Sequence, residues 1–338
     1  MGLNGSIPFE QLEELIPLRM GEKKVPGLSI AIVRDAKLLW SSGFGVANVE
    51  TGDSVTADTV FSAQSLSKPV FAYGALKLYE EGVIDLDTPL TEYTSEPYLP
   101  EDPHVGEITM RHVLSHTCGF PNWRSEGKPL KVLFNPGERF SYSGEGYKYL
   151  GSVIEEVTGE PLDRFMDEKV LTPLCMGGGY TWGEEKGDLV TAHDGDGAPR
   201  GVKRWDEINP AASLCCSALD YARFICALMR PGEDECRLRG DDVRDADPPS
   251  GGVLFHLVGA GLGHPAHGSG GCFLAVGSGR CRGRRVPELC DRLHGGWPGR
   301  RRHDQRLERA QDLRGGREGG AGWGAPRVRR LPETITER

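Results

Sequence analysis

Ser65-Leu66-Ser67-Lys68 opens a predicted helix, and Tyr142-Ser143-Gly144 stands just before a second one. Residues i and i+3 of a helix lie about 5–6 Å apart at Cβ, so the Lys68 amine can reach the Ser65 hydroxyl. A serine hydroxyl becomes a nucleophile only when a neighbouring group removes its proton. These residue types therefore predict Ser65 as nucleophile and Lys68 as general base, with Tyr142 sharing the proton transfer as a phenolate beside the ammonium.

This chemistry makes two demands on the surroundings of Ser65. Burial and nearby positive charge must lower the pKa of Lys68 from about 10.4 towards neutrality. Two hydrogen-bond donors must also face the developing oxyanion, and the Ser65 backbone N–H at a helix N-terminus can supply one of them. We expect the second donor from a strand edge elsewhere. Taken alone, the S-x-x-K pattern is also compatible with the exposed start of a surface helix.

Five segments resemble the class C β-lactamases and their carboxylesterase relatives, in that family's order, over about residues 20–230. They are residues 61–68, 83–90, 112–119, 136–143 and 217–224. The resemblance implies a β-lactamase/transpeptidase-like α/β fold, in which an antiparallel sheet is flanked by helices and a mostly helical domain is inserted. It also implies that Ser65, Lys68 and Tyr142 are the catalytic residues, and it suggests neither a metal nor an organic cofactor.

Gly144 departs from the family pattern, in which the tyrosine motif usually ends in an Asn that helps to hold a β-lactam side-chain amide. This difference favours a hydrolase of short-chain carboxylic esters, with weak β-lactam hydrolysis as a side activity. The alternatives are a β-lactamase, a D-Ala-D-Ala-peptidase-like amide hydrolase, or a catalytically dead binding protein of the same fold. We interpret His116 as a structural histidine bonded to nearby backbone, whereas Trp123 and Trp182 either line a pocket or pack in the core.

Two short apolar runs near the beginning of the chain predict a β-hairpin. Residues 28–33 and 38–40 are rich in strand-forming side chains and are separated by Arg34-Asp35-Ala36. Because a hairpin alone is only marginally stable, we expect it to find partner strands in the C-terminal part of the chain.

Helical periodicity describes much of the remaining sequence. Apolar side chains recur at helical spacing over residues 65–81 and 147–158, and again after Ser217, where Ser217 and Asp220 form a predicted capping pair. Between residues 85 and 230 no segment has a convincing strand pattern. We therefore predict an N-terminal part of the α/β domain (1–84), a helical domain (85–230) and a C-terminal part of the α/β domain (231–338).

The composition changes abruptly after residue 230. Residues 231–338 contain 19 Arg, no Lys and 22 of the 47 Gly of the chain. Reading the codons one base later permits family-like segments, in the family's order, at residues 245–249, 259–267, 274–277, 285–290 and 300–312. Our hypothesis is a one-base shift in the coding DNA between Arg230 and Asp245. If the protein carries it, we expect the hairpin's partner strands, the second oxyanion donor and the closing helix to be missing, and the chain to be inactive or insoluble.

The remaining expectations concern location and partners. The first residues contain no apolar stretch that resembles a secretory signal, which predicts a cytoplasmic protein without a membrane partner. Nine cysteines without a C-x-x-C pair predict free thiols. The basic tail could serve as a nucleic-acid arm, but acidic residues are mixed into it and aromatic residues are few, so we expect no nucleic-acid partner. The expected partner is a small-molecule ester or β-lactam, and the oligomeric state stays open.

Overall fold

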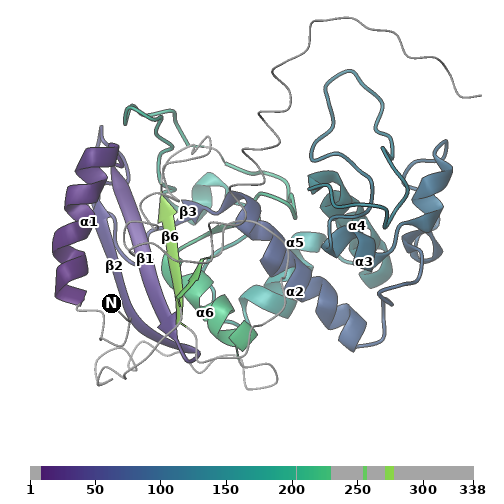
Figure 1. Ribbon diagram of the computed structural model, residues 1–338, viewed down its shortest axis with the longest axis horizontal. Helices are drawn as coiled ribbons and strands as arrows, with labels where there is room; N and C mark the ends of the chain where they lie inside the picture. Colours follow the sequence, from purple (N-terminus) through teal and green to yellow (C-terminus); the bar gives the residue numbers. More distant parts are fainter. Residues whose placement is uncertain (1–8, 203, 230–253, 257–270, 278–338) are drawn as a thin grey trace, which may run out of the picture. The chain divides into compact units, whose positions relative to one another are not determined.

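A four-stranded sheet contains the predicted hairpin. The computed structural model describes residues 9–202, 204–229, 254–256 and 271–277, which all belong to the unit Met1–Arg282. The hairpin consists of β1 (Gly27–Arg34) and β2 (Lys37–Gly45), which confirms the prediction. β6 (Gly271–Gly277) pairs antiparallel with the other edge of β1, and β5 (Leu254–His256) pairs parallel with β6, so the strand order is β2-β1-β6-β5 (Figure 1).

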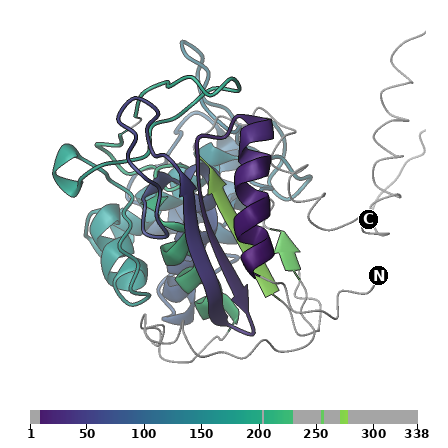
Figure 2. The same cartoon turned by 90° about the vertical axis from the view of Figure 1, so that its left-hand side faces the viewer.

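The central strand β1 is buried at every residue because helices cover both faces of the sheet. Leu28 and Ile30 point towards α1 (Phe9–Lys23), which lies along one face (Figure 2). Ala31 and Val33 alternate with them and join the main core, to which α6 (Ala218–Met229) contributes. Burial on both faces accounts for the continuous apolar run in the sequence of β1.

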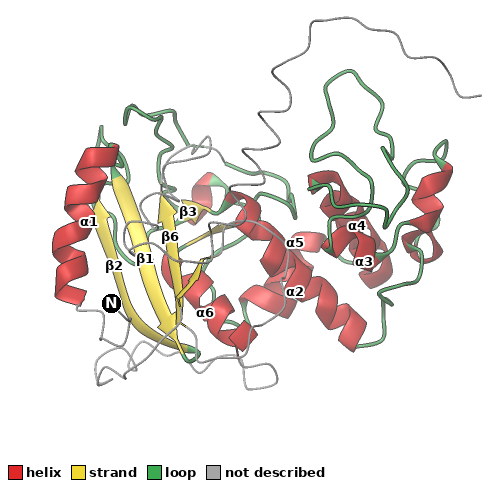
Figure 3. Ribbon diagram, in the orientation of Figure 1, coloured by secondary structure: helices red, strands yellow, loops and turns green. Residues whose placement is uncertain are grey.

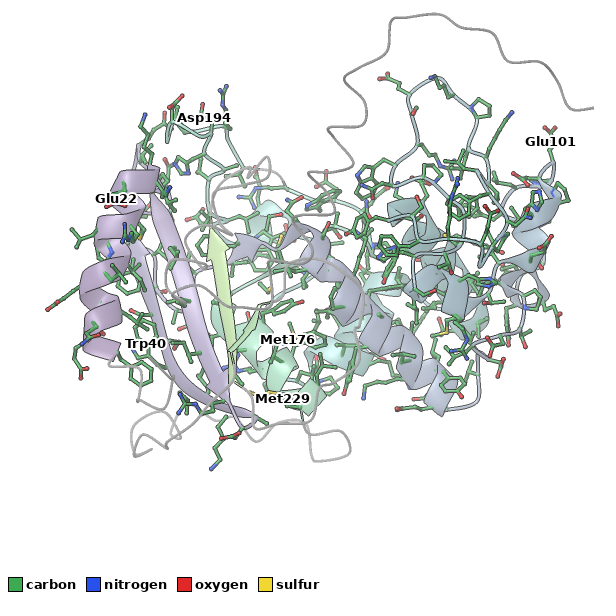
Figure 4. All side chains as sticks on the ribbon, in the orientation of Figure 1. Glu22, Trp40, Glu101, Met176, Asp194 and Met229 are labelled. Carbon is green, nitrogen blue, oxygen red and sulfur yellow. The ribbon has the colours of Figure 1, made fainter. Side chains whose placement is uncertain are left out.

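Helix α1 was not predicted from the sequence. It contains Pro17, and only Ile16 and Met20 along its length are buried, so the apolar pattern is weak. Its N-terminal end is held by Phe9, whose ring stacks on Trp40 of β2 with a centroid distance of 5.7 Å. Trp40 is labelled in Figure 4. Tertiary contact with the sheet therefore stabilises this helix more than its own sequence pattern does.

The remaining elements are mostly helices joined by long loops (Figure 3). The α-helices are α2 (Ser67–Glu80), α3 (Met110–Leu114), α4 (Gly144–Thr158) and α5 (Leu162–Met166). Short helical turns cover Gln64–Leu66, Leu90–Tyr93, Pro103–Glu107, Asp167–Leu171 and Glu184–Lys186. The predicted helices over 65–81 and 147–158 are confirmed. The expectation of no strand between 85 and 230 was wrong at β4 (Cys215–Cys216), which pairs with β3 (Phe61–Ser62) and is too short to show a strand pattern.

The predicted capping pair at the start of α6 is confirmed. The Ser217 hydroxyl accepts a hydrogen bond from the Asp220 N–H at 3.0 Å, and the Asp220 carboxylate accepts one from the Ser217 N–H at 3.1 Å. The two side chains thus satisfy two backbone donors that the first turn of a helix cannot satisfy itself.

The structure bears in part on the expectations for the C-terminal region. The hairpin has a partner strand in the C-terminal part of the chain, as predicted, since Leu28 lies opposite Gly277 and Arg34 opposite Gly271. The expectation that this strand is missing, which depended on the one-base shift, was wrong at this edge. Of the five segments that the alternative reading frame permits, residues 274–277 lie in β6, and the other four lie outside the described residues. The domain boundaries at 84/85 and 230/231 stay predictions, and one core cluster contains residues from both sides of the first.

Cys118, Cys215, Cys216 and Cys226 are buried thiols outside any disulfide, as predicted, whereas Cys175 is in a disulfide, so the expectation was wrong at that residue. Within the described ranges, no helix combines the length and the apolar character needed to cross a bilayer.

Candidate active site

Ser65 lies at an exposed, strained turn immediately before α2. Gln64, the preceding residue, has φ of 50°, a left-handed conformation that non-glycine residues rarely adopt. The buried Ser67 holds this turn in place, because its hydroxyl donates to the Gln64 carbonyl and accepts the Leu214 N–H at 2.9 Å. The strain thus sits next to Ser65 and is offset by bonds to a distant segment. The sequence motif gave no indication of this role for Ser67.

Lys68 brings its amine to Ser65, as the spacing predicts. Its Nζ lies 3.4 Å from Ser65 Oγ and donates to the Ala211 carbonyl at 2.8 Å. The residue is 3% exposed, and no carboxylate in the described part of the chain forms an ion pair with it. Burial without a countercharge disfavours the ammonium and lowers the pKa of Lys68 from 10.5 to about 8. The amine thus lies close to the Ser65 hydroxyl and has a lowered pKa, and a general base for this hydroxyl needs both properties.

Tyr142 reaches the same place from the loop before α4. Its side chain is hydrogen-bonded to Ser65, and its ring lies 4.6 Å from Lys68 Nζ. Burial nevertheless raises the pKa of Tyr142 above its usual value of 10, and the bond to Ser65 only partly offsets this. The phenolate expected from the sequence is thus disfavoured, because a partly buried phenol avoids the charge. The geometry instead suits a neutral hydroxyl that can donate a proton.

His116 has the structural role that the sequence analysis predicts. Its Nδ1 accepts the Ser143 N–H at 3.1 Å, and its carbonyl accepts the Ser141 N–H at 2.8 Å. The two bonds fix the backbone on either side of Tyr142, whose ring lies 4.5 Å from the imidazole. Burial and the nearby charge of Lys68 lower the pKa of His116 to about 4, so the ring is neutral at neutral pH.

The two tryptophans left open by the sequence have different environments. Trp182 is buried and packs with Leu189 and Cys215, so it is a core residue. Trp123 is 41% exposed, and its ring lies 5.7 Å from Lys68 Nζ. Trp123 therefore belongs to the surroundings of the Ser65 site.

One donor for an oxyanion is present at Ser65 itself. The first hydrogen bond of the turn runs from Leu66 N to Ala63 O at 3.1 Å, so the Ser65 N–H precedes it and has no partner within the helix. A second donor, expected from a strand edge, stays a prediction. Among the described side chains there is no group of three or more His, Cys, Asp or Glu that could hold a metal ion.

A family model described as "Beta-lactamase" matches residues 12–270. The esterase EstB of Burkholderia gladioli is 28% identical over 220 residues, which are 56% of this chain and 56% of that protein. The chain thus spans about half the length of this curated relative.

Two solved structures have a similar fold. The octameric penicillin-binding protein homologue from Pyrococcus abyssi is 28% identical, with a TM-score of 0.58 over 68% of this chain and 58% of that one. The D-alanine carboxypeptidase AmpC from Burkholderia cenocepacia is 23% identical, with a TM-score of 0.58 over 67% of this chain and 65% of that one. These likenesses confirm the expected β-lactamase/transpeptidase-like α/β fold.

Proposed function

Since the chain belongs to the beta-lactamase family, we propose that it is a serine hydrolase that cleaves short-chain carboxylic esters through an acyl-enzyme on Ser65. The observation that carries the proposal is the position of Lys68 Nζ, 3.4 Å from Ser65 Oγ, with a pKa lowered to about 8 by burial. A Lys–Ser pair on the surface would have neither the buried amine nor the shifted pKa. The mechanism uses this chain's own residues and requires no metal or organic cofactor.

In the proposed reaction Lys68 accepts the Ser65 hydroxyl proton as Oγ forms a bond to the substrate carbonyl carbon. The Ser65 N–H stabilises the resulting oxyanion. When the ester C–O bond breaks, the Tyr142 hydroxyl protonates the leaving alkoxide and is reprotonated by the Lys68 ammonium. Water then attacks the acyl-enzyme, giving its proton to the same pair of groups, and Ser65 recovers its proton as the Oγ–carbon bond breaks.

The proposed substrate preference rests on Gly144 and on the relatives. The position that usually carries an amide side chain in the family has none here, which favours esters over β-lactams. The similar protein from Burkholderia gladioli is named an esterase, whereas the similar Pyrococcus structure is of a penicillin-binding protein homologue. We accordingly propose a small-molecule ester as the main substrate and slow β-lactam turnover as a side reaction, with no nucleic-acid or membrane partner.

Covalent labelling tests the proposal directly. The purified protein is treated with a serine-reactive phosphonate, and its intact mass is compared with the 36.9 kDa of the chain. We expect one adduct, mapped to the peptide that contains Ser65, together with release of p-nitrophenol from a short-chain p-nitrophenyl ester. A different starting mass would reveal another reading frame. An unlabelled protein of the correct mass would instead show a binding protein without the hydrolase mechanism.

The rate of labelling is expected to depend on pH through Lys68. Only the neutral amine can accept the Ser65 proton, so below its pKa of about 8 the rate rises about tenfold for each pH unit and levels off above it. The measurement is the second-order rate constant of phosphonate labelling across this range. His116, with a pKa of about 4, contributes no inflection near neutrality. A profile that is flat from about pH 6 to 9 would rule out Lys68 as the base.

A further inference from the structure

Beside the Ser65 site, the Trp123 ring occupies the volume that a side chain at position 144 would fill. A Cβ added at Gly144 would lie 2.8 Å from Trp123 Cζ3, 3.0 Å from Trp123 Cη2 and 2.6 Å from the Asn122 carbonyl oxygen. Any larger side chain at this position would therefore have to displace both the indole and the backbone beside it. The Gly144 N–H also donates to the Asn122 carbonyl at 3.0 Å and to the Asn122 side-chain oxygen at 3.1 Å, which keeps the two segments together.

The Trp123 ring is held over this site by its neighbour in the sequence. Arg124 donates from its backbone N–H to Glu145 Oε1 at 3.3 Å and from Nε to Oε2 at 2.8 Å. Arg124 Nη2 also donates to the Tyr98 hydroxyl at 2.8 Å, and the Glu145 side chain is 1% exposed. A buried carboxylate that has two bonds to one residue fixes that residue's backbone as well as its side chain. Glu145 and Arg124 thus position the loop that carries Trp123.

Trp123 presents an aromatic surface to the reacting groups. The centroid of its ring lies 5.7 Å from Lys68 Nζ and 5.8 Å from Lys148 Nζ, and the residue keeps 41% of its surface exposed. An exposed indole close to a nucleophile offers apolar contact area and no carbonyl acceptor or amide pair for a polar side chain. The Trp123 ring therefore forms an apolar surface where a side chain at position 144 would otherwise lie.

We propose that Trp123, together with Gly144, is the specificity-determining pair of the Ser65 site, and this inference rests on the proposed hydrolase function. The indole binds the apolar acyl group of an ester and excludes substrates whose recognition depends on an amide-bearing side chain at position 144. Trp123 and Gly144 act as one unit, so neither can be exchanged alone for the family's usual arrangement. Glu145 and Arg124 are positioning residues for the Trp123 ring.

A double-mutant cycle tests the pair. The variants are Trp123→Ala, Gly144→Asn and the double variant, each assayed with a p-nitrophenyl butyrate ester and a chromogenic cephalosporin. We expect Trp123→Ala to raise KM for the ester about tenfold with little change in kcat, as loss of an apolar contact does. Gly144→Asn alone is expected to lower kcat/KM for both substrates. In the double variant the indole no longer blocks the new side chain, although the Asn122 carbonyl still lies beside it, so we expect recovery of part of the cephalosporin activity that Gly144→Asn loses. The ratio of kcat/KM for the cephalosporin to kcat/KM for the ester is expected to rise at least about tenfold.

The controls separate the inference from the function on which it rests. If the wild-type protein takes no phosphonate at Ser65, the proposed function fails. If it is labelled but the three variants behave additively, with the substrate ratio unchanged, only the specificity pair is overturned. Thermal unfolding of each variant identifies a loss of activity that is due to misfolding, and the rate of phosphonate labelling of Trp123→Ala gives a second readout that does not depend on turnover.

Arg124 provides the test of positioning. It is half-exposed, so Arg124→Ala can be made with less risk to the fold than a change at the buried Glu145. We expect Arg124→Ala to raise KM for the ester in the same direction as Trp123→Ala, with kcat kept, and Arg124→Lys to restore part of the affinity. An Arg124→Ala protein with wild-type KM would show that the ion pair has no part in holding the indole.

Discussion

Replacing Lys68 by methionine is expected to slow acylation of Ser65 by about 10²- to 10⁴-fold, the usual contribution of a positioned general base. Methionine keeps most of the buried volume of the lysine side chain and removes the amine that lies 3.4 Å from Ser65 Oγ. The Ser65 N–H and the Tyr142 hydroxyl stay in place, so the residual rate reports what they contribute. The measurement is the rate constant for phosphonate labelling, with release of p-nitrophenol as the turnover assay.

Two further variants serve as comparisons for Lys68→Met. Ser65→Ala removes an exposed hydroxyl, so it is expected to abolish labelling and turnover without changing the thermal unfolding temperature. Tyr142→Phe is expected to slow phosphonate labelling less than Lys68→Met does. In the proposed mechanism the Tyr142 hydroxyl protonates the leaving group, and the leaving group of a phosphonate differs from the alkoxide of an ester. If the Lys68→Met protein is labelled at the wild-type rate, a group other than Lys68 is the general base.

The largest expected loss of stability follows the change Asp220→Ala. One carboxylate oxygen of Asp220 accepts from the Ser217 N–H and hydroxyl at 3.1 and 2.9 Å, and the other accepts from the Gly177 N–H and from Arg223, both at 2.9 Å. Alanine removes the acceptor of all four bonds, and Arg223, whose side chain is 22% exposed, keeps only its bond to the Cys175 carbonyl at 2.8 Å within the described part of the chain. We expect about 3–5 kcal/mol less free energy of unfolding, as for a broken buried ion pair. The measurement is urea denaturation followed by circular dichroism.

Matched changes separate the buried network from a simple loss of charge. Ser217→Ala removes only the capping hydroxyl and is expected to cost about 1 kcal/mol. Asp87 forms two hydrogen bonds with Arg111 at the exposed surface, so Asp87→Ala is expected to leave the urea midpoint nearly unchanged. If Asp87→Ala and Asp220→Ala shift the midpoint equally, the stabilisation would come from net charge and not from the buried bonds.

Several features of this site could be predicted from the sequence because they depend on residues close together in the chain. The distance between Ser65 and Lys68 follows from the spacing of a helical turn, and the bonds between Ser217 and Asp220 follow from the geometry of a helix N-terminus. The burial of β1 on both faces could not be predicted from the hairpin alone, because the helices that cover its two faces, α1 and α6, come from distant parts of the chain.

The sequence by itself determined which residues are able to react: Ser65, with Lys68 one helical turn away, and Tyr142 just before a second helix. It also contains the five family-like segments between residues 61 and 224. Only the tertiary structure decided their state. Lys68 is buried against the Ala211 carbonyl, 143 positions away, and this burial lowers its pKa to about 8. Burial also raises the pKa of Tyr142 above its usual value, whereas Trp123 keeps 41% of its surface exposed. Desolvation depends on every group around an atom, and those groups come from segments that the linear sequence keeps apart.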